Sequence, residues 1–301
     1  MPPLAERMYG GLKLEQRPLR AAAVSAALLF GLQPSVAQDT AQGSTQDVRT
    51  IVREQKTSSS TSGGSSSNSQ TRGTLIERIV ERQADTVELE YDLPSPLDER
   101  RGSDVWMFPA RVTKIPGEPP VLLNEEEIAV RLEAWLTDHP ELREYCGKHV
   151  FTWTAIRIDC DPRAVLEAIA PYDLRPGVLE AGEPYQEDGT ISPVPLRLQS
   201  EYPGGSIYVA SLALDPRPLR EEEARMRMAV AEMTRQEPLS LNDALAELEG
   251  KLYDGTLTVT FQTDAVGRVV QRTRETEITI SEPGGPMETR SATDIVVVNV
   301  D

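Results

Sequence analysis

The sequence contains few of the residues that usually carry catalysis or metal binding. Its 301 residues include two cysteines and two histidines, and aromatic residues make up 5%. It lacks a Cys-x-x-Cys pair, a Gly-x-Ser-x-Gly turn and a Gly-rich loop followed by Lys-Ser or Lys-Thr. These absences argue against thiol redox chemistry, an elbow-type serine hydrolase and P-loop nucleotide binding. The remaining residues indicate no cofactor, and we expect a protein that is not an enzyme.

Positive charge and long apolar runs are also scarce. Lysine and arginine number 31 against 48 acidic residues, so the net charge is −17 at pH 7. An acidic surface repels phosphate backbones, which makes nucleic acid a poor partner. The apolar run Ala21–Leu32 is too short to cross a bilayer, which takes about 20 residues, and no later run is longer. We therefore expect no transmembrane segment in the mature chain.

Residues 1–37 have the pattern of an export signal. Basic residues precede the apolar run, and Ser35-Val36-Ala37 has the small-x-small pattern of a cleavage site before Gln38. An uncleaved anchor at the membrane surface is the alternative. The sequence thus predicts cleavage between Ala37 and Gln38 and a periplasmic or extracellular protein.

The C-terminal segment, 255–300, reads as three strands joined by two turns. Leu257, Val259 and Phe261 alternate with threonines, so one face of the first strand is apolar and the other carries hydroxyls. Gly267 marks the first turn, and Gly284-Gly285 marks the second. In the second strand the apolar residues Val270, Ile278 and Ile280 fall on one face. Such strands are stable only when their apolar face is covered.

A second group of strands is expected near the start of the mature chain. Segments 47–54 and 73–80 are strand-like, and Thr86–Asp92 alternates apolar residues with acids. The Ser/Thr-rich stretch between the first two has two interpretations. Residues 38–72 are a flexible linker, or they belong to a long hairpin with Gly63-Gly64 at its tip. Two strand groups at the two ends predict one curved antiparallel sheet within a single α+β domain, 73–301.

This pattern resembles the half-barrel sheet of lipoprotein-carrier-type domains found in exported bacterial proteins, many of them uncharacterised. The resemblance is carried by the Thr-rich alternation and by the turn Val266-Gly-Arg-Val-Val270. It implies a curved sheet whose inner face is covered by helices and can hold an apolar ligand such as a lipid.

The middle of the chain, residues 122–250, is expected to be a mixed helical insertion that covers one face of the sheet. Asn124 has the position of a helix cap for 125–137, with Glu127 completing a capping box. A second helix is predicted over 219–236, with Glu221–Glu223 solvated in its first turn. Residues 196–198 and 206–214 are predicted to be strands paired across a Pro-Gly-Gly turn.

The two cysteines, Cys146 and Cys160, are predicted to form a disulfide, as expected for an even pair in an exported protein. A zinc site is the alternative, because His149 follows Cys146 with a two-residue gap and His139 is close in sequence. Either histidine could act as a general base, and this is the basis of an enzyme hypothesis for the neighbourhood of Cys146 and Cys160.

The candidate ligand-binding residues are apolar. Leu257, Val259 and Phe261 form the predicted inner face of the sheet, and Trp106 and Trp135, together with Trp153, are predicted to form an apolar cluster between insertion and sheet. We expect an exported, non-catalytic binding or scaffold protein of the cell envelope, whose partner is an apolar ligand or another envelope protein. A carrier of a lipid and an enzyme are the two alternatives.

Overall fold

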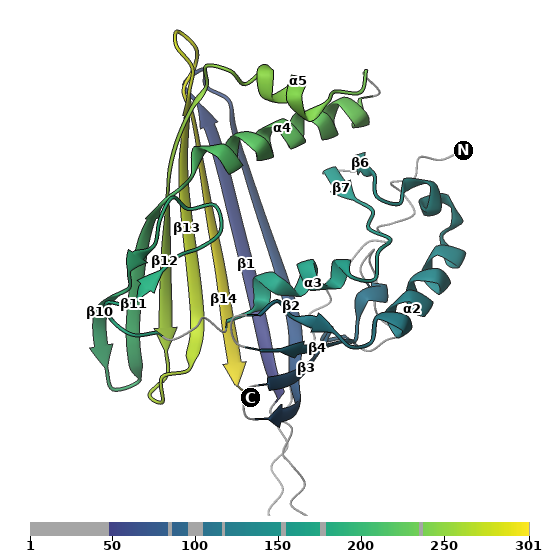
Figure 1. Cartoon of the computed structure of the whole chain (residues 1–301), viewed down its shortest axis with the longest axis vertical. Helices are drawn as coiled ribbons and strands as arrows, with labels where there is room; N and C mark the ends of the chain where they lie inside the picture. Colours follow the sequence, from purple (N-terminus) through teal and green to yellow (C-terminus); the bar gives the residue numbers. More distant parts are fainter. Residues whose placement is uncertain are drawn as a thin grey trace, which may run out of the picture. The chain divides into compact units, whose positions relative to one another are not determined.

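An antiparallel sheet of ten strands dominates the computed structural model (Figure 1). The structure describes residues 48–83, 86–95, 105–115, 118–151, 155–174, 179–234 and 237–300. The predicted export signal, its cleavage site at Ala37–Gln38 and Trp153 lie outside the described residues. Within the described residues the strand order is β10-β11-β12-β13-β14-β1-β2-β3-β4-β5, and the sheet is curved and not closed.

The ten strands are β1 (Val48–Thr61), β2 (Ser66–Gln83), β3 (Thr86–Asp92), β4 (Ala110–Lys114), β5 (Val121–Leu122), β10 (Arg197–Tyr202), β11 (Gly205–Ala213), β12 (Leu252–Thr263), β13 (Val269–Ser281) and β14 (Glu288–Val300). Two small sheets accompany them, β6 (His149–Phe151) with β7 (Ala155–Arg157), and β8 (Pro184–Tyr185) with β9 (Val194–Pro195). The α-helices are α2 (Glu125–Asp138), α3 (Ala164–Ile169), α4 (Pro216–Met233) and α5 (Leu241–Ala246). Short 3₁₀ helices span Val105–Met107, Pro140–Tyr145 and Ala170–Tyr172.

The two terminal strand groups meet at the centre of the sheet. β1 and β14 pair from Arg49 opposite Val300 to Thr61 opposite Glu288. The predicted antiparallel sheet with terminal strand groups is therefore confirmed. The insertion does more than cover this sheet, because its strands β10 and β11 pair with β12 and extend the sheet at one edge.

The Ser/Thr-rich stretch forms the hairpin, one of its two interpretations, over the part that is described. β1 and β2 pair along their length, with Ser60 opposite Ser66 next to the turn. Gly64 in this turn has φ of +91°, a conformation that glycine adopts without a Cβ clash. Across the strands, the Ser59 and Ser67 hydroxyls lie 2.9 Å apart. The backbone ladders to β2 and β14 hold the end of β1 near the turn in place, although its side chains, Thr57–Thr61, are small and polar.

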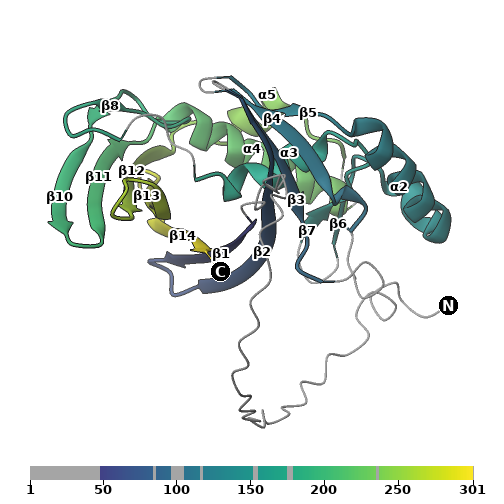
Figure 2. The ribbon, with the colours of Figure 1, turned by 90° about the horizontal axis from the view of Figure 1, so that it is seen from below.

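The sheet has an inner face, on the side of the helices, and an outer face (Figure 2). Leu257 and Val259 of β12 belong to the inner face, and alternate residues such as Thr258 belong to the outer face. The strand register places the neighbours: Val259 is opposite Arg274, Arg274 is opposite Asp294, and Asp294 is opposite Gln55. We call such a set of residues, opposite one another on adjacent strands, a row. The inner face is a series of these rows.

Three apolar clusters stabilise the fold. The largest packs α2 and α3 on the inner face of β1–β4 and includes Ile51, Leu89 and Ile128. The second lies on β11 and β12, under the segment that contains β8 and β9. The third lies between α4 and α5 and includes Ala224 and Leu248. Because each cluster covers a different part of the sheet or a helix pair, the inner face is not covered by one continuous core.

Two local predictions in the insertion are partly wrong. α2 begins after Asn124, as predicted, but the Asn124 side chain makes no capping hydrogen bond; its amide donates to the Pro109 carbonyl and its oxygen accepts from the Arg111 N–H. α4 begins at Pro216, after the N-cap Asp215, and not at residue 219. Proline fits the first turn of a helix, where its missing N–H has no partner to lose. This earlier start moves Glu223 out of the first turn and into contact with the sheet.

Candidate functional site on the inner face of the sheet

The predicted apolar face of β12 is packed against protein. Leu257, Val259 and Phe261 are 2%, 0% and 1% exposed. They share a cluster with buried residues of β11 and of the segment before β10, and the Tyr185 ring contacts Phe261 edge-on at 5.5 Å between centroids. In the structure as described, these three side chains therefore present almost no surface to a ligand.

Trp106 and Trp135 belong to a different cluster. Trp106 is buried in the core beneath α2, and Trp135 packs against the same core from α2. The structure brings these two residues together, as predicted, but not with Leu257, Val259 and Phe261, which belong to the cluster on β11 and β12.

The predicted disulfide is present. Cys146 and Cys160 are bonded, with their Cα atoms 5.3 Å apart, so neither sulfur is a thiolate that could bind zinc. His139 Nδ1 donates to the Trp135 carbonyl at 2.9 Å, and His149 Nδ1 lies 3.6 Å from a Glu232 carboxylate oxygen. In the described part of the chain, no three or more His, Cys, Asp or Glu side chains are arranged to hold a metal. No described helix is long and apolar enough to span a bilayer.

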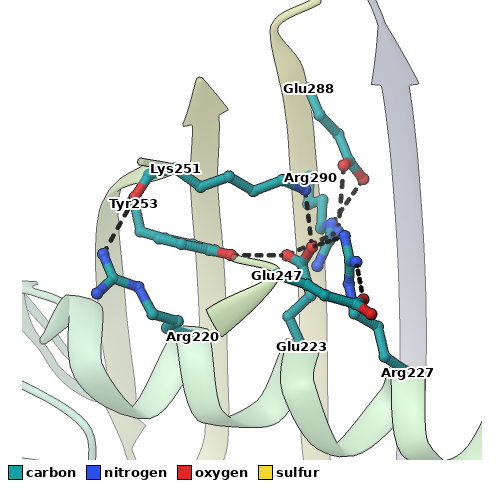
Figure 3. A network of polar contacts seen from close by, with 8 residues as sticks. All are labelled: Arg220, Glu223, Arg227, Glu247, Lys251, Tyr253, Glu288 and Arg290. Atoms are coloured by element: carbon teal, nitrogen blue, oxygen red, sulfur yellow. Dashed lines mark hydrogen bonds and ion pairs between the residues drawn. The ribbon is translucent and has the colours of Figure 1, made fainter. Parts of the chain in front are cut away.

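A buried carboxylate attaches α4 to the sheet (Figure 3). Glu223 is 8% exposed and lies among groups from β12, β14 and the residue before β12. Its oxygens lie 3.0 Å from Lys251 Nζ, 3.1 Å from the Tyr253 hydroxyl and 3.5 Å from an Arg290 guanidinium nitrogen. Arg227, one turn along α4, is 3.7 Å away and also pairs with another carboxylate, Glu247. The helix therefore meets the sheet through charge and hydrogen bonds and not through an apolar stripe.

The surroundings of Glu223 favour its ionised form. Burial by itself would raise the pKa of the Glu223 carboxyl, but the contacts with Lys251, Arg290 and Tyr253 outweigh it and lower the pKa below its ordinary value. Burial and the same carboxylate raise the pKa of the Tyr253 hydroxyl to about 12. Glu223 is thus a charged anchor and Tyr253 a neutral donor over the ordinary pH range.

The side of α4 next to Glu223 is otherwise apolar and partly uncovered. Leu219, Met226, Val230 and Met233 recur at helical spacing and form a line that we call the α4 stripe. Met226 is 56% exposed and Val230 is 46% exposed. Ala224, on nearly the opposite side of the helix, packs against α5. In Figure 1, α5 lies toward the β1–β2 turn relative to α4, and the α4 stripe lies on the side of the helix away from α5.

The inner face next to the α4 stripe is open to solvent. Thr57 of β1 and Ser69 and Thr71 of β2 belong to this face and are exposed. Their neighbours in the rows, Ala292 of β14 and Thr276 of β13, are partly buried. We call these five residues the inner window. It lies between the part of the sheet that α4 covers and the part covered by α3 and the segment that follows it.

Three arginines border the inner window on the side away from α4. Arg53 pairs with Asp294 at 2.7 Å. Arg272 donates to the carbonyls of Pro171 and Asp173, which fixes the segment after α3 to the sheet. Arg274 pairs with Glu187 at 2.6 Å, and the Tyr185 hydroxyl donates to the other oxygen of the same carboxylate.

The arginine group is incompletely satisfied. Within the described part of the chain, the Nε atoms of Arg272 and Arg274 are buried without a hydrogen-bond partner. Burial, followed by the charge of Arg274, lowers the pKa of Arg272. Burial and the hydrogen bond to Glu187 raise the pKa of Tyr185, so the phenol stays a donor to that carboxylate. The group contains three cations and the two carboxylates of Asp294 and Glu187.

Sequence reasoning missed these polar groups, although a signal was present. Arg272 and Arg274 are an even number of residues from Ile278 and Ile280, so they lie on the same side of the strand. Ile278 and Ile280 were predicted to share one apolar face of the second tail strand. Two arginines in an inward-facing series could have been recognised as unusual. Asp215-Pro216 could likewise have marked the start of α4, because an N-cap followed by proline is a helix-start signature.

Two shallow pockets lie on the sheet, and the second includes Thr57 and Ser69 of the inner window in its lining. One, of about 350 Å³, is at the β10–β12 end of the sheet, where Tyr202, Tyr208 and Gly205 contribute to its lining. The other, of about 390 Å³, lies over β1, β2 and β14 and is lined mostly by outer-face residues such as Lys56 and Asn68. Neither is lined by the predicted apolar residues of β12 or by the α4 stripe.

Comparisons with known proteins give little. No protein-family model matches the chain, and no curated protein is significantly similar to it in sequence. A structure described as "lipid-protein interactions in lipovitellin" aligns with a TM-score of 0.40 and 8% identity over 84% of this chain. This chain spans only 25% of that protein. A DUF1329 family protein from Desulfovibrio piger aligns with a TM-score of 0.12 and 9% identity, over 83% of this chain and 85% of its own. Similarity this low identifies neither a function nor a ligand.

Proposed function

We propose that the protein is an exported, non-catalytic binding protein that holds an amphiphilic, lipid-like ligand on the inner face of its sheet. The ligand lies in the inner window, with its apolar part against the α4 stripe. The observation that carries this proposal is the exposure of two apolar side chains, Met226 and Val230, on the side of α4 away from α5. Apolar side chains at helical spacing, next to uncovered hydroxyls of a sheet, suit a molecule with an apolar and a polar part.

The proposal places the ligand beside Leu257, Val259 and Phe261 and not on them, because these side chains already pack against protein. Export is supported by the signal-like pattern of residues 1–37 and by the disulfide between Cys146 and Cys160, since disulfides persist in oxidising compartments.

A scaffold role toward another envelope protein is the second candidate, and a different observation favours it. All six residues of the edge strand β10 are exposed, so its outer backbone groups are available for pairing with a strand of a partner. A bulge between Leu198 and Ser200 interrupts the strand, which weakens this candidate, because bulges at sheet edges discourage pairing. For the enzyme hypothesis, the described residues near Cys146 and Cys160 add no candidate catalytic side chain to His139 and His149.

The test is a binding measurement with a neutral amphiphile. Decyl maltoside, below its critical micelle concentration, is titrated into the purified protein by calorimetry. We expect saturable binding to the wild-type protein and at least about tenfold weaker binding to the double variant Met226→Ser/Val230→Ser, since each buried methylene contributes about 0.8 kcal/mol. The matched control is Val130→Ser on α2, which removes an apolar side chain that is 70% exposed but lies outside the site.

Native mass spectrometry of the protein recovered from the periplasm provides an independent test for a bound amphiphile. A co-purifying amphiphile in the wild-type protein, lost in the double variant and kept in the Val130 control, supports the proposal. Equal binding of decyl maltoside to all three proteins, or no binding to any, contradicts it.

A further inference from the structure

The arginine group at the border of the inner window has the chemistry of an anion site. Arg272 and Arg274 are two residues apart on the same face of β13, so their side chains leave the strand about 7 Å apart. Both have a buried Nε without a hydrogen-bond partner among the described residues. A buried N–H that lacks an acceptor is costly, and unpaired groups of this kind call for an explanation. The Arg274 side chain is 36% exposed, so a phosphate or carboxylate can reach its guanidinium from solvent.

The local charge around the arginine group also favours an anion site. Arg53, Arg272 and Arg274 face two carboxylates, so this part of the inner face is locally positive in a protein whose net charge is −17. Lys114, at the end of β4, pairs with Asp173 beside the group and leaves this local excess unchanged. A positive site in an acidic protein favours an anion at that place and repels it elsewhere.

Glu187 already occupies part of this group as an internal anion. Its carboxylate bonds to Arg274 at 2.6 Å and accepts from Tyr185, and it belongs to the segment between β8 and β9 and not to the sheet. A ligand anion competes with Glu187 for Arg274. Removing the charge of Glu187 therefore strengthens anion binding, which is the opposite of what general damage to the site would do.

We infer that Arg272 and Arg274 bind the anionic head group of the ligand, a phosphate or a carboxylate, while its alkyl chain extends along the inner window to the α4 stripe. Arg274 and Ile278 are four residues apart, about 13 Å along β13, and Ile278 lies opposite Arg290, which contacts α4 through Glu223. A medium-length alkyl chain spans that distance. This inference rests on the proposed function and names the class of ligand, an anionic single-chain amphiphile.

The experiment compares head groups on one chain. Decyl maltoside, decyl phosphate and decyltrimethylammonium are titrated below their critical micelle concentrations into the wild-type protein and its variants, and decanoate is used in a second series. We expect decyl phosphate to bind at least about tenfold tighter than decyl maltoside, as charge-assisted hydrogen bonds to arginine are among the stronger kind. The inference is supported if decyl phosphate or decanoate binds more tightly than decyl maltoside and if this difference depends on Arg274.

The variants separate charge from structure. Arg274→Gln should remove the preference for the anion and leave decyl maltoside binding within about twofold, whereas Arg274→Lys should keep part of the preference. Glu187→Gln should widen the preference several-fold, and Glu183→Gln, which removes an exposed charge just before β8, should not. Arg274→Gln leaves Glu187 unpaired, so the double variant Glu187→Gln/Arg274→Gln is measured as well, with thermal unfolding as the check on folding.

The outcomes distinguish the two proposals. If neither decyl maltoside nor decyl phosphate binds, the proposed function is wrong. It is also wrong if both bind equally well to the wild-type protein and to Met226→Ser/Val230→Ser. If decyl maltoside and decyl phosphate bind equally well and depend on the α4 stripe, the proposed function stands and the anion site is wrong. An anion preference that survives both in Arg274→Gln and in its double variant also overturns the anion site.

Discussion

The Tyr253 hydroxyl donates a hydrogen bond of 3.1 Å to the Glu223 carboxylate, from the second residue of β12 to the middle of α4. Both side chains are almost fully buried. Together with Lys251 and Arg290, they form the contact through which α4 is held at one end of the inner face. The position of α4 relative to the sheet therefore depends on a polar contact at this end of the inner face.

Replacement of Glu223 should loosen α4. Glu223→Gln leaves Lys251 and Arg290 without their shared counterion, and the expected loss is about 3 kcal/mol in the free energy of unfolding, at the low end for a broken buried ion pair. Urea denaturation measures it. The control is Glu222→Gln on the preceding residue, which is exposed and should change the free energy by no more than about 0.5 kcal/mol. Equal, small effects in both variants would show that the cluster contributes nothing.

Acid should weaken the same contact. Because the pKa of Glu223 is lowered in the folded protein, its contribution to stability is complete above the ordinary value of 4.5 and is lost as the pH falls through the lower folded value. Unfolding free energies of the wild-type protein should therefore fall more steeply below pH 4.5 than those of Glu223→Gln. Parallel pH profiles for the two proteins would contradict the lowered pKa.

Reduction of the disulfide should destabilise the insertion. The bond closes a loop between residues that are 14 apart in sequence, and the chain-entropy estimate for a loop of this size is about 3 kcal/mol. The double variant Cys146→Ser/Cys160→Ser should therefore unfold at lower urea concentration, and added reductant should lower the midpoint of the wild-type protein but not that of the variant. A reductant effect of the same size on both proteins would assign it to another cause.

Gly73 should not tolerate a side chain. A Cβ at this position in β2 would lie 2.0 Å from the Tyr172 hydroxyl, which covers the strand from the segment after α3. Gly73→Ala should cost about 1–3 kcal/mol, as for other overpacked sites. In a Tyr172→Phe background the nearest ring carbon would be 3.3 Å away, so the same substitution should cost less there. A double-mutant cycle with no coupling would show that Tyr172 does not lie over Gly73.

Much of the fold could be predicted because local signals agreed with the tertiary structure. The alternation around Leu257 and the glycine turns predict β12–β14, and the Cys146–Cys160 disulfide follows from the presence of two cysteines in a chain predicted to be exported. The candidate site could not be predicted in the same way. Pairings such as Arg274 with Glu187 join segments far apart in sequence, and nothing in the local pattern of either segment specifies the other.

Burial of charge also limited the prediction. Glu223 sits within Glu221–Glu223, a run that is typical of a solvated helix start, and its burial depends on where α4 begins and on a lysine and an arginine in other elements. The burial of such a residue cannot be predicted before its partners in other elements are known. By contrast, the apolar residues of β12 were assigned correctly to the inner face because period-two alternation needs no knowledge of the rest of the chain.

The pairing of β14 with both β13 and β1 has a consequence for how the chain folds. β14 follows all other described strands in sequence, yet it lies between the two halves of the sheet. Before β14 is in place, β10–β13 and β1–β5 are separate halves with exposed edges. Within the sheet, the two halves meet at the β1–β14 pairing, between residues more than 200 positions apart, such as Arg53 and Asp294. Such long-range closure is slow, so refolding should show a late phase in which both edges are vulnerable to aggregation.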